Sequence, residues 1–207
     1  MTRAREILKW HAELAREEVE PHPAYSLYRE STALLVVDMQ EKLGVAMPEK
    51  PFEAAVANTV RLVETAKAFE LPVLVTEQYP KGLGPTVPAI LEALPEGSNR
   101  VEKMDFSCAE LEEIRGALEA RHRRQVIVVG QETHVCVFQT VRDLVELGWF
   151  VHVARDACVS RRKENWNLGL DLMHGLGATI TGTETILFDL LQSASDPNFR
   201  ALSKLVR

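Results

Sequence analysis

The segment Ala33-Leu34-Leu35-Val36-Val37-Asp38 is apolar at every position until its final aspartate. A strand that is exposed on one face alternates apolar and polar residues, whereas a strand covered on both faces is apolar throughout. We therefore expect this segment to form a strand of a parallel sheet that helices cover on both faces.

Five more short β runs follow along the chain, at residues 73–77, 100–104, 126–130, 149–154 and 178–181. Helical segments lie between them, over about 52–69, 107–121, 133–147, 163–175 and 184–192. Ser107-Cys108-Ala109-Glu110 has the form of a capping box, and Thr133 is placed to cap the next helix. This alternation predicts one doubly wound, three-layer α/β domain of about six mainly parallel strands, of the Rossmann-like type.

The N-terminus has a different pattern from the rest of the chain. Residues 3–18 carry apolar side chains at helical spacing, and Glu20-Pro21-His22-Pro23 then interrupts the helix. We expect an N-terminal helical extension over residues 1–30 and one α/β domain over residues 31–207. No internal repeat, low-complexity tract or shift of composition marks a further boundary.

The composition is that of an ordinary soluble globular protein: 46% of the 207 residues are hydrophobic and 26% are charged. The formal net charge of -6 argues against nucleic acid as a partner. The apolar runs are too short for a signal peptide or a membrane span. The three cysteines form no CxxC pair, which is typical of reduced thiols, so we expect a cytoplasmic protein.

Polar residues end several of the apolar strands, and ligand sites of open parallel sheets lie beyond these carboxyl ends. The polar residues are Asp38, Glu77, Lys103 and Asp156, and Cys136 closely follows the fourth strand. No glycine-rich turn of the dinucleotide or P-loop type follows the first strand, so we expect no nucleotide cofactor.

Cys136 is the candidate nucleophile. A helix N-terminus and an ammonium such as Lys103 are expected to lower the pKa of this thiol, and a carboxylate such as Asp38 could accept its proton. Taken singly, the three residues have plainer interpretations: a buried apolar thiol, the cap of a strand end and a surface ion pair. Cys108 and Cys158 keep the first interpretation, with Cys108 as the second candidate nucleophile.

Separated segments of the chain resemble the isochorismatase-like cysteine hydrolase superfamily over about residues 31–192. The similarity rests on residues 34–40, on Glu102-Lys103 before Phe106-Ser107, on residues 128–137 and on residues 156–161. Residues 76–84 are similar to the branch of isochorismatase-domain-containing proteins.

The resemblance implies that Asp38, Lys103 and Cys136 form a catalytic triad. It also implies a cis peptide bond between Gln131 and Glu132, and an oxyanion hole made by the backbone N–H groups of Glu132 and Cys136. The candidates to line the substrate pocket are Gln40, Tyr79, Phe106, His134 and Phe138, although His134 is equally compatible with a solvent-facing position.

The chain departs from the nicotinamidases of this superfamily, which carry an Asp-x-His metal motif after the second strand. Glu77-Gln78-Tyr79 stands there instead, and no histidine lies between His22 and His122. A transition-metal site needs several imidazole or carboxylate ligands. We therefore expect no metal and no cofactor, with Glu77 as a hydrogen-bonded anchor for a loop.

The expected activity is hydrolysis of an amide-type C–N bond in a small molecule through a thioester intermediate. Isochorismatase itself cleaves a vinyl ether without needing a cysteine, so Cys136 favours the amidase side of the superfamily. A catalytically weak scaffold or regulatory binding protein of the same fold is one alternative, and a thiol redox sensor is another. We also expect a homo-oligomer, as is common in the family, with neither nucleic acid nor a membrane as partner.

The apolar stripe of residues 3–18 leads to a first prediction. Such a stripe is stable only when it is covered, so we expect it to pack against the core or a neighbouring subunit. Deleting residues 2–20 should change the oligomer distribution in light scattering or lower the melting temperature in calorimetry. Identical values of both for the deleted and the full chain would contradict the prediction.

Overall fold

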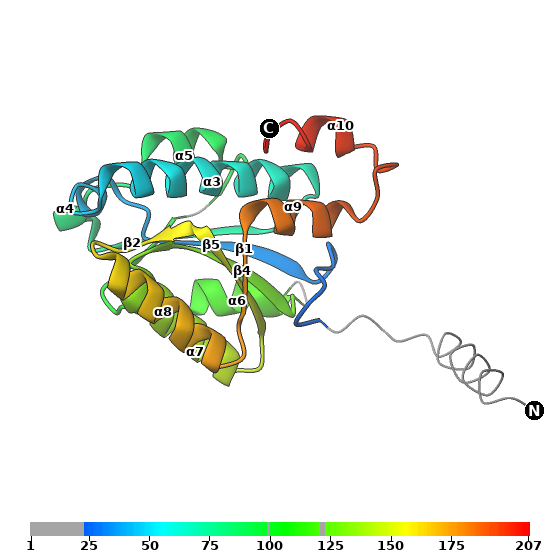
Figure 1. Ribbon diagram of the computed structural model, residues 1–207. Coiled ribbons are helices and arrows are strands. Elements are labelled where there is room, and N and C mark those ends of the chain that lie inside the picture. The colour runs from blue at the N-terminus through cyan, green and yellow to red at the C-terminus, as the bar shows by residue number, and fades with distance from the viewer. Residues whose placement is uncertain (1–22, 99, 121–122) are drawn as a thin grey trace, which may run out of the picture.

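The computed structural model describes residues 23–98, 100–120 and 123–207 of the chain. Its centre is a six-stranded, all-parallel sheet in the order β3-β2-β1-β4-β5-β6 (Figure 1). The strands are β1 (Thr32–Val37), β2 (Val73–Gln78), β3 (Arg100–Lys103), β4 (Gln125–Gln131), β5 (Phe150–Val159) and β6 (Thr179–Thr181). The predicted doubly wound α/β fold is confirmed.

The sheet is covered by helices on both faces (Figure 1). One face carries α3 (Glu49–Ala68), α5 (Pro88–Ala93), α9 (Thr183–Leu191) and α10 (Phe199–Leu202). The other carries α6 (Glu112–Ala120), α7 (Phe138–Glu146) and α8 (Lys163–Gly175). The short helices α2 (Glu41–Gly44) and α4 (Pro80–Leu83) and the π-helix η1 (Thr133–Val137) follow the carboxyl ends of β1, β2 and β4.

β1 decides the layering, because all six of its residues are buried between two neighbouring strands. Successive side chains of a strand point to opposite faces. Accordingly, Leu34 and Val36 join the apolar cluster under α3, α5 and α9, whereas Leu35 and Val37 join the cluster under α6, α7 and α8. A continuous apolar run is therefore what this position in the fold requires.

Strand β5 is longer than the sequence predicts. Val153 pairs with Val128, but Cys158 pairs with Gly130, so the residues between Val153 and Cys158 bulge out of the ladder and the strand continues to Val159. Asp156 consequently lies in the bulge rather than at the carboxyl end of the strand.

The Asp156 side chain serves the start of α9. Its Oδ1 accepts hydrogen bonds from the N–H of Thr183 (2.9 Å) and from the Thr183 hydroxyl (2.9 Å). A carboxylate that accepts from the first turn of a helix stabilises the helix end. Asp156 is therefore a helix-capping residue here.

Helix α6 begins later than the predicted capping box at 107–110, because its first residue is Glu112. The ammonium of Lys103 lies 3.1 Å from the carbonyl of Asp105 and 2.9 Å from that of Phe106. These bonds hold the preceding segment as a loop around the lysine, and tertiary contacts thereby override the local helix signal.

The predicted helix over residues 3–18 lies outside the described part of the chain. From Pro23 onward the chain is attached to the domain: Gln125 Nε2 donates to the carbonyl of Pro23 at 2.7 Å, and the N–H of Leu27 donates to Asp189 Oδ2 at 2.7 Å. The last residues of the predicted extension thus pack against β4 and α9. Among the described helices, none is both long and apolar enough to cross a membrane.

Gly130 gives a direct test of how closely β4 approaches β1. Its φ is +139°, and a Cβ atom there would stand 2.1 Å from the carbonyl oxygen of Val37. We expect Gly130→Ala to lower the free energy of unfolding by at least about 3 kcal/mol in chemical denaturation. The matched control is Gly116→Ala in α6, where a Cβ meets open space and should raise stability by about 0.5–1 kcal/mol. Equal effects of the two substitutions would refute the close approach.

Candidate active site

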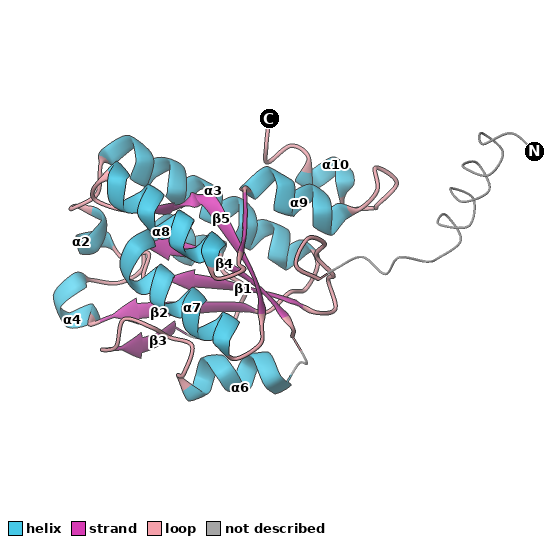
Figure 2. Ribbon diagram, turned by 60° about the horizontal axis from the view of Figure 1, so that its bottom comes forward, coloured by secondary structure: helices cyan, strands magenta, loops and turns pink. Residues whose placement is uncertain are grey.

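The site lies at the carboxyl edge of the sheet, where the strand arrowheads of β1, β2 and β3 point in Figure 2. Asp38 follows β1 directly, with a φ of +52°, a left-handed conformation that aspartate tolerates better than most residues. Its Oδ1 accepts a hydrogen bond from Thr76 Oγ1 (2.7 Å), and its Oδ2 accepts one from Lys103 Nζ (2.7 Å). The carboxylate is completely buried.

Lys103 is the last residue of β3, and its side chain is also completely buried. Besides Asp38, its ammonium contacts Gln78 Oε1 at 2.9 Å and the carbonyls of Asp105 and Phe106. A buried cation persists only where a counter-charge and hydrogen bonds replace its hydration shell. The alternative interpretation of Lys103 as a surface ion pair is therefore wrong.

Cys136 lies in η1, immediately beyond β4, and is only 5% exposed. Its thiol lies close enough to the Asp38 carboxylate for each group to shift the pKa of the other. Burial, together with the negative charge of Asp38, raises the pKa of Cys136 to about 12, and the ammonium of Lys103 only partly opposes this. The expectation of a lowered pKa is wrong, because loss of hydration costs the thiolate more than the nearby cation returns.

The Asp38 carboxyl also has a raised pKa, chiefly because burial penalises its charged form, with Lys103 and the Thr76 hydroxyl acting in the opposite direction. A carboxylate with a raised pKa is a stronger base than one in water. The site therefore places a protonated thiol beside a carboxylate that is a stronger base than usual.

The peptide bond between Gln131 and Glu132 is cis, as the resemblance implies. Glu132 precedes η1, and its nearly buried carboxylate is bound by Arg161, whose N–H and guanidinium donate to it at 3.0–3.1 Å. Thr133 does not cap the helix: its buried hydroxyl has no hydrogen-bond partner among the described residues. Arg161 thus fixes the Glu132 side chain at the end of β4, and the Thr133 side chain makes no capping hydrogen bond.

Two of the expected pocket residues present aromatic rings at the surface beside the buried lysine. Tyr79 is 48% exposed, and its N–H donates to the Lys103 carbonyl at 2.9 Å. Phe106 is 52% exposed, and its carbonyl accepts from the Lys103 ammonium. Both backbones are anchored to the triad while the rings remain available to a ligand.

The other three pocket candidates differ in what they can offer. His134 is half-buried, with Nδ1 at 3.1 Å from Ser160 Oγ and Nε2 at 3.2 Å from Asn165 Nδ2, so both ring nitrogens already have partners. Phe138 is partly buried among the apolar residues under α7. Gln40 is completely buried, and its amide bonds to the backbone of Gln78 and Gly84, so it joins loops and offers no polar atom to a substrate.

The side chains of three polar residues of the site were given no role from the sequence: Thr76, Gln78 and Gln131, of which Gln131 was expected only as part of the cis peptide. Thr76 and Gln78 bind Asp38 and Lys103, and Gln131 Nε2 donates to the Asp38 carbonyl at 2.9 Å. A sequence signal was present, because polar residues end the otherwise apolar strands β2 and β4. Their partners were hidden, since strand order is not readable from the sequence.

Glu77 performs the loop-anchoring role that we expected of it. Its Oε1 accepts from the N–H of Thr86 (2.8 Å) and the Thr86 hydroxyl (2.7 Å), and the Arg100 guanidinium lies at 3.3 Å. Across the described ranges, no group of three or more His, Cys, Asp or Glu side chains converges as metal ligands would.

Cys108 and Cys158 are free, buried thiols, as is Cys136. Burial raises the pKa of both to about 12. Cys108 Sγ lies 3.4 Å from the Thr140 hydroxyl. Neither thiol contacts a base of the kind that Asp38 provides for Cys136, which leaves Cys136 as the candidate nucleophile.

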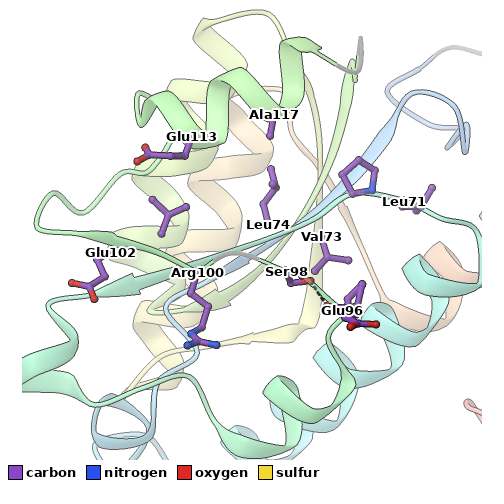
Figure 3. A pocket seen from close by; sticks show the side chains of 13 residues that line it. Leu71, Val73, Leu74, Glu96, Ser98, Arg100, Glu102, Glu113 and Ala117 are labelled. Carbon is purple, nitrogen blue, oxygen red and sulfur yellow. Dashed lines mark hydrogen bonds between the residues drawn. The ribbon is translucent and has the colours of Figure 1, made fainter.

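None of the three triad residues lines the cavity of about 700 Å³ that Figure 3 shows. It is lined by the loop after α5, by the start of β2 and by Arg100, Glu102 and Glu113. Arg100 and Lys103 are the opposite ends of β3, so the cavity opens toward the amino half of the strands. It contains neither a cysteine nor a histidine, and we assign it no role in the reaction.

The parallel α/β sheet places an aspartate, a lysine and a cysteine at its carboxyl edge, as the resemblance to isochorismatase-like hydrolases implies. The family model described as isochorismatase domain matches residues 32–185, and the chain belongs to this family. The Xenopus laevis isochorismatase domain-containing protein 2 is 36% identical over 176 residues, which cover 85% of this chain and 83% of that protein.

Solved structures agree with this assignment. A Caenorhabditis elegans protein described as MAR1 ribonuclease is 37% identical, with a TM-score of 0.82 over 87% of this chain and 92% of that one. The Escherichia coli YcaC gene product, described as an octameric hydrolase of unknown specificity, is 23% identical, with a TM-score of 0.80 over 90% and 91% of the two chains. The second similarity shows the shared fold alone.

The raised pKa of Cys136 predicts how the thiol reacts with a simple electrophile. Only the thiolate is alkylated, and its fraction rises about tenfold per pH unit below the pKa. We expect the rate of Cys136 alkylation by iodoacetamide, followed by peptide mass spectrometry, to keep rising from pH 7 to pH 10. The alkylation rate of glutathione, measured in the same samples, should level off near the pKa of its thiol. A plateau in the alkylation rate of Cys136 below pH 9 would contradict a thiol that is protonated at neutral pH.

Proposed function

We propose that this member of a hydrolase family cleaves an amide-type C–N bond of a small molecule through a thioester on Cys136. The observation that carries the proposal is the shared Asp38 carboxylate, which raises the pKa of the Cys136 thiol while the Lys103 ammonium holds its Oδ2 at 2.7 Å. A nucleophile, its base and a fixed cation are the parts that covalent acyl transfer requires.

In the first step, Asp38 takes the thiol proton as the Cys136 sulfur attacks the carbonyl carbon of the substrate. A free thiolate is disfavoured by burial, so proton transfer and C–S bond formation occur together. Lys103 keeps the base in place, and the backbone N–H groups of Glu132 and Cys136 stabilise the oxyanion. Each such donor typically contributes about 3 kcal/mol.

In the second step, the protonated Asp38 gives its proton to the leaving amine or ammonia, and the C–N bond breaks. Asp38 then accepts a proton from the water that attacks the thioester. The C–S bond breaks, the carboxylic acid leaves, and Asp38 returns the proton to the Cys136 sulfur. The raised pKa of Asp38 suits this role, because the group must hold a proton between the two halves of the reaction. The exposed rings of Tyr79 and Phe106 are available to contact the substrate.

A second candidate activity comes from the solved relatives. The Caenorhabditis elegans protein at 37% identity is described as a ribonuclease, and one from Leishmania major at 32% identity as a putative ribonuclease. RNA hydrolysis by this chain is therefore included as an alternative in the test. We favour the small molecule, because the net charge of -6 provides little attraction for a polyanion. We also propose a cytoplasmic homo-oligomer that needs no metal or other cofactor.

The triad predicts a specific set of inactive variants. A screen of small amides, carbamoyl compounds and ureides by ammonia release should identify a substrate. With it, Cys136→Ala and Asp38→Ala should each lower kcat/KM by at least about 1000-fold, because nucleophile and base act in the same bond-making step. Circular dichroism should show that both variants remain folded.

Cys108→Ala and Cys158→Ala are the matched controls and should keep most of the activity, because neither thiol contacts Asp38. Cys136→Ala should also fail to accumulate a covalent acyl adduct in intact-mass spectrometry. Turnover by Cys136→Ala at a rate near that of the unaltered chain would disprove the proposal. Cleavage of RNA that survives in Cys136→Ala would instead support an independent ribonuclease site.

A further inference from the structure

A second cavity, of about 460 Å³, lies between α3, the end of β5 and the start of α8. Its apolar part consists of Pro48, Pro51, Ala54 and Val159. We call it the α3–α8 cavity. None of the three triad residues lines it, and its volume falls in the range of small-molecule pockets.

The polar residues around the α3–α8 cavity are predominantly cationic. Arg155 and Lys163 both line it and are exposed, and neither has a carboxylate within 4.0 Å in the part of the chain that the structure describes. Asp156 also lines the cavity, but its carboxylate is taken up by the N–H and hydroxyl of Thr183. Two cations thus outnumber the one carboxylate of the cavity, and neither is paired with it.

Two helix N-termini border the same cavity. Pro48 is the N-cap of α3, which has 20 residues, and Lys163 is the first residue of α8, which has 13. Neither N-terminus has a side chain that caps it by a hydrogen bond, although each first turn carries one glutamate, Glu49 in α3 and Glu164 in α8. Uncapped N–H groups and the positive ends of helix dipoles favour a negative charge. The helix ends and the side-chain cations therefore select for the same sign of ligand.

Trp166 and Cys158 complete the wall of the α3–α8 cavity. The Arg155 guanidinium lies 5.0 Å from the ring centre of Trp166, which keeps it at the cavity, and the indole N–H donates to the Cys158 carbonyl at 3.0 Å. Burial raises the pKa of the Cys158 thiol to about 12, so the thiol adds no charge. Trp166 and Cys158 thus add an aromatic and uncharged part to the wall.

We propose that the α3–α8 cavity binds a small amphipathic monocarboxylate, with its apolar body against the prolines, Ala54 and Trp166 and its carboxylate at Lys163 and Arg155. A neutral apolar ligand would leave both cations and the helix ends without a partner. A polyanion has no apolar surface to bury against the apolar wall of the cavity. The cavity is also connected to the nucleophile's helix, because Ser160, which lines it, contacts His134 of η1 at 3.1 Å.

The test compares 4-phenylbutyrate with its neutral amide, which has the same apolar body. Isothermal titration calorimetry of the full chain at low ionic strength should show saturable binding of the carboxylate, at least tenfold tighter than the amide. Lys163→Gln should remove most of that preference. Lys204→Gln, which replaces an exposed lysine away from the cavity, should leave it unchanged.

Ala54→Phe is the second variant, because Ala54 is exposed on α3 and a phenyl ring there fills the cavity without disturbing the core. It should abolish binding of both ligands. Equal affinities of acid and amide, binding that Ala54→Phe leaves intact, or no saturation up to 10 mM would each overturn the proposal. Light scattering could also show an oligomer that Ala54→Phe dissociates. That result would overturn the proposal too, because the cavity would then lie between two copies of the chain. None of these readouts depends on turnover, so the result is independent of the proposed hydrolysis.

Discussion

The ion pair between Lys103 and Asp38 is the interaction on which the site depends. Its two charged groups are 2.7 Å apart, and neither side chain is exposed. Removing two charges from water is costly, and the cost is offset only by good geometry and further hydrogen bonds. Here Thr76, Gln78 and the carbonyls of Asp105 and Phe106 supply them.

This requirement explains the local irregularities around the pair. The 103–108 segment stays a loop because its carbonyls must face the ammonium, and so α6 begins only at Glu112. Strand β2 lies between β1 and β3, and neighbouring strands are about 4.8 Å apart. The lysine therefore has to span two strand spacings, and the polar end of β2 fills the space beneath it.

The same burial sets the protonation state of the nucleophile. A thiol beside an ammonium would lose its proton readily if it were hydrated, but Cys136 is nearly enclosed and also faces the Asp38 carboxylate. Desolvation penalises both anions, and so a single proton is best shared between thiol and carboxylate. A thiol that keeps its proton is oxidised and alkylated slowly, because the thiolate is the reactive form. This property favours a hydrolase over a thiol redox sensor.

The sequence by itself determined the strands and the residues at their ends. The apolar runs at 33–37 and 126–129 mark strands buried on both faces, and this pattern survives folding because each face needs its own core. Asp38, Lys103 and Cys136 stood out for the same reason, as polar or reactive groups next to such strands.

The tertiary structure alone decided which neighbours they meet. Gly130 passing close to Val37, Gln78 beneath Lys103, the bulge that displaces Asp156 and the raised pKa of Cys136 all depend on strand order and on exclusion of water. Neither is encoded in the pattern of any one segment.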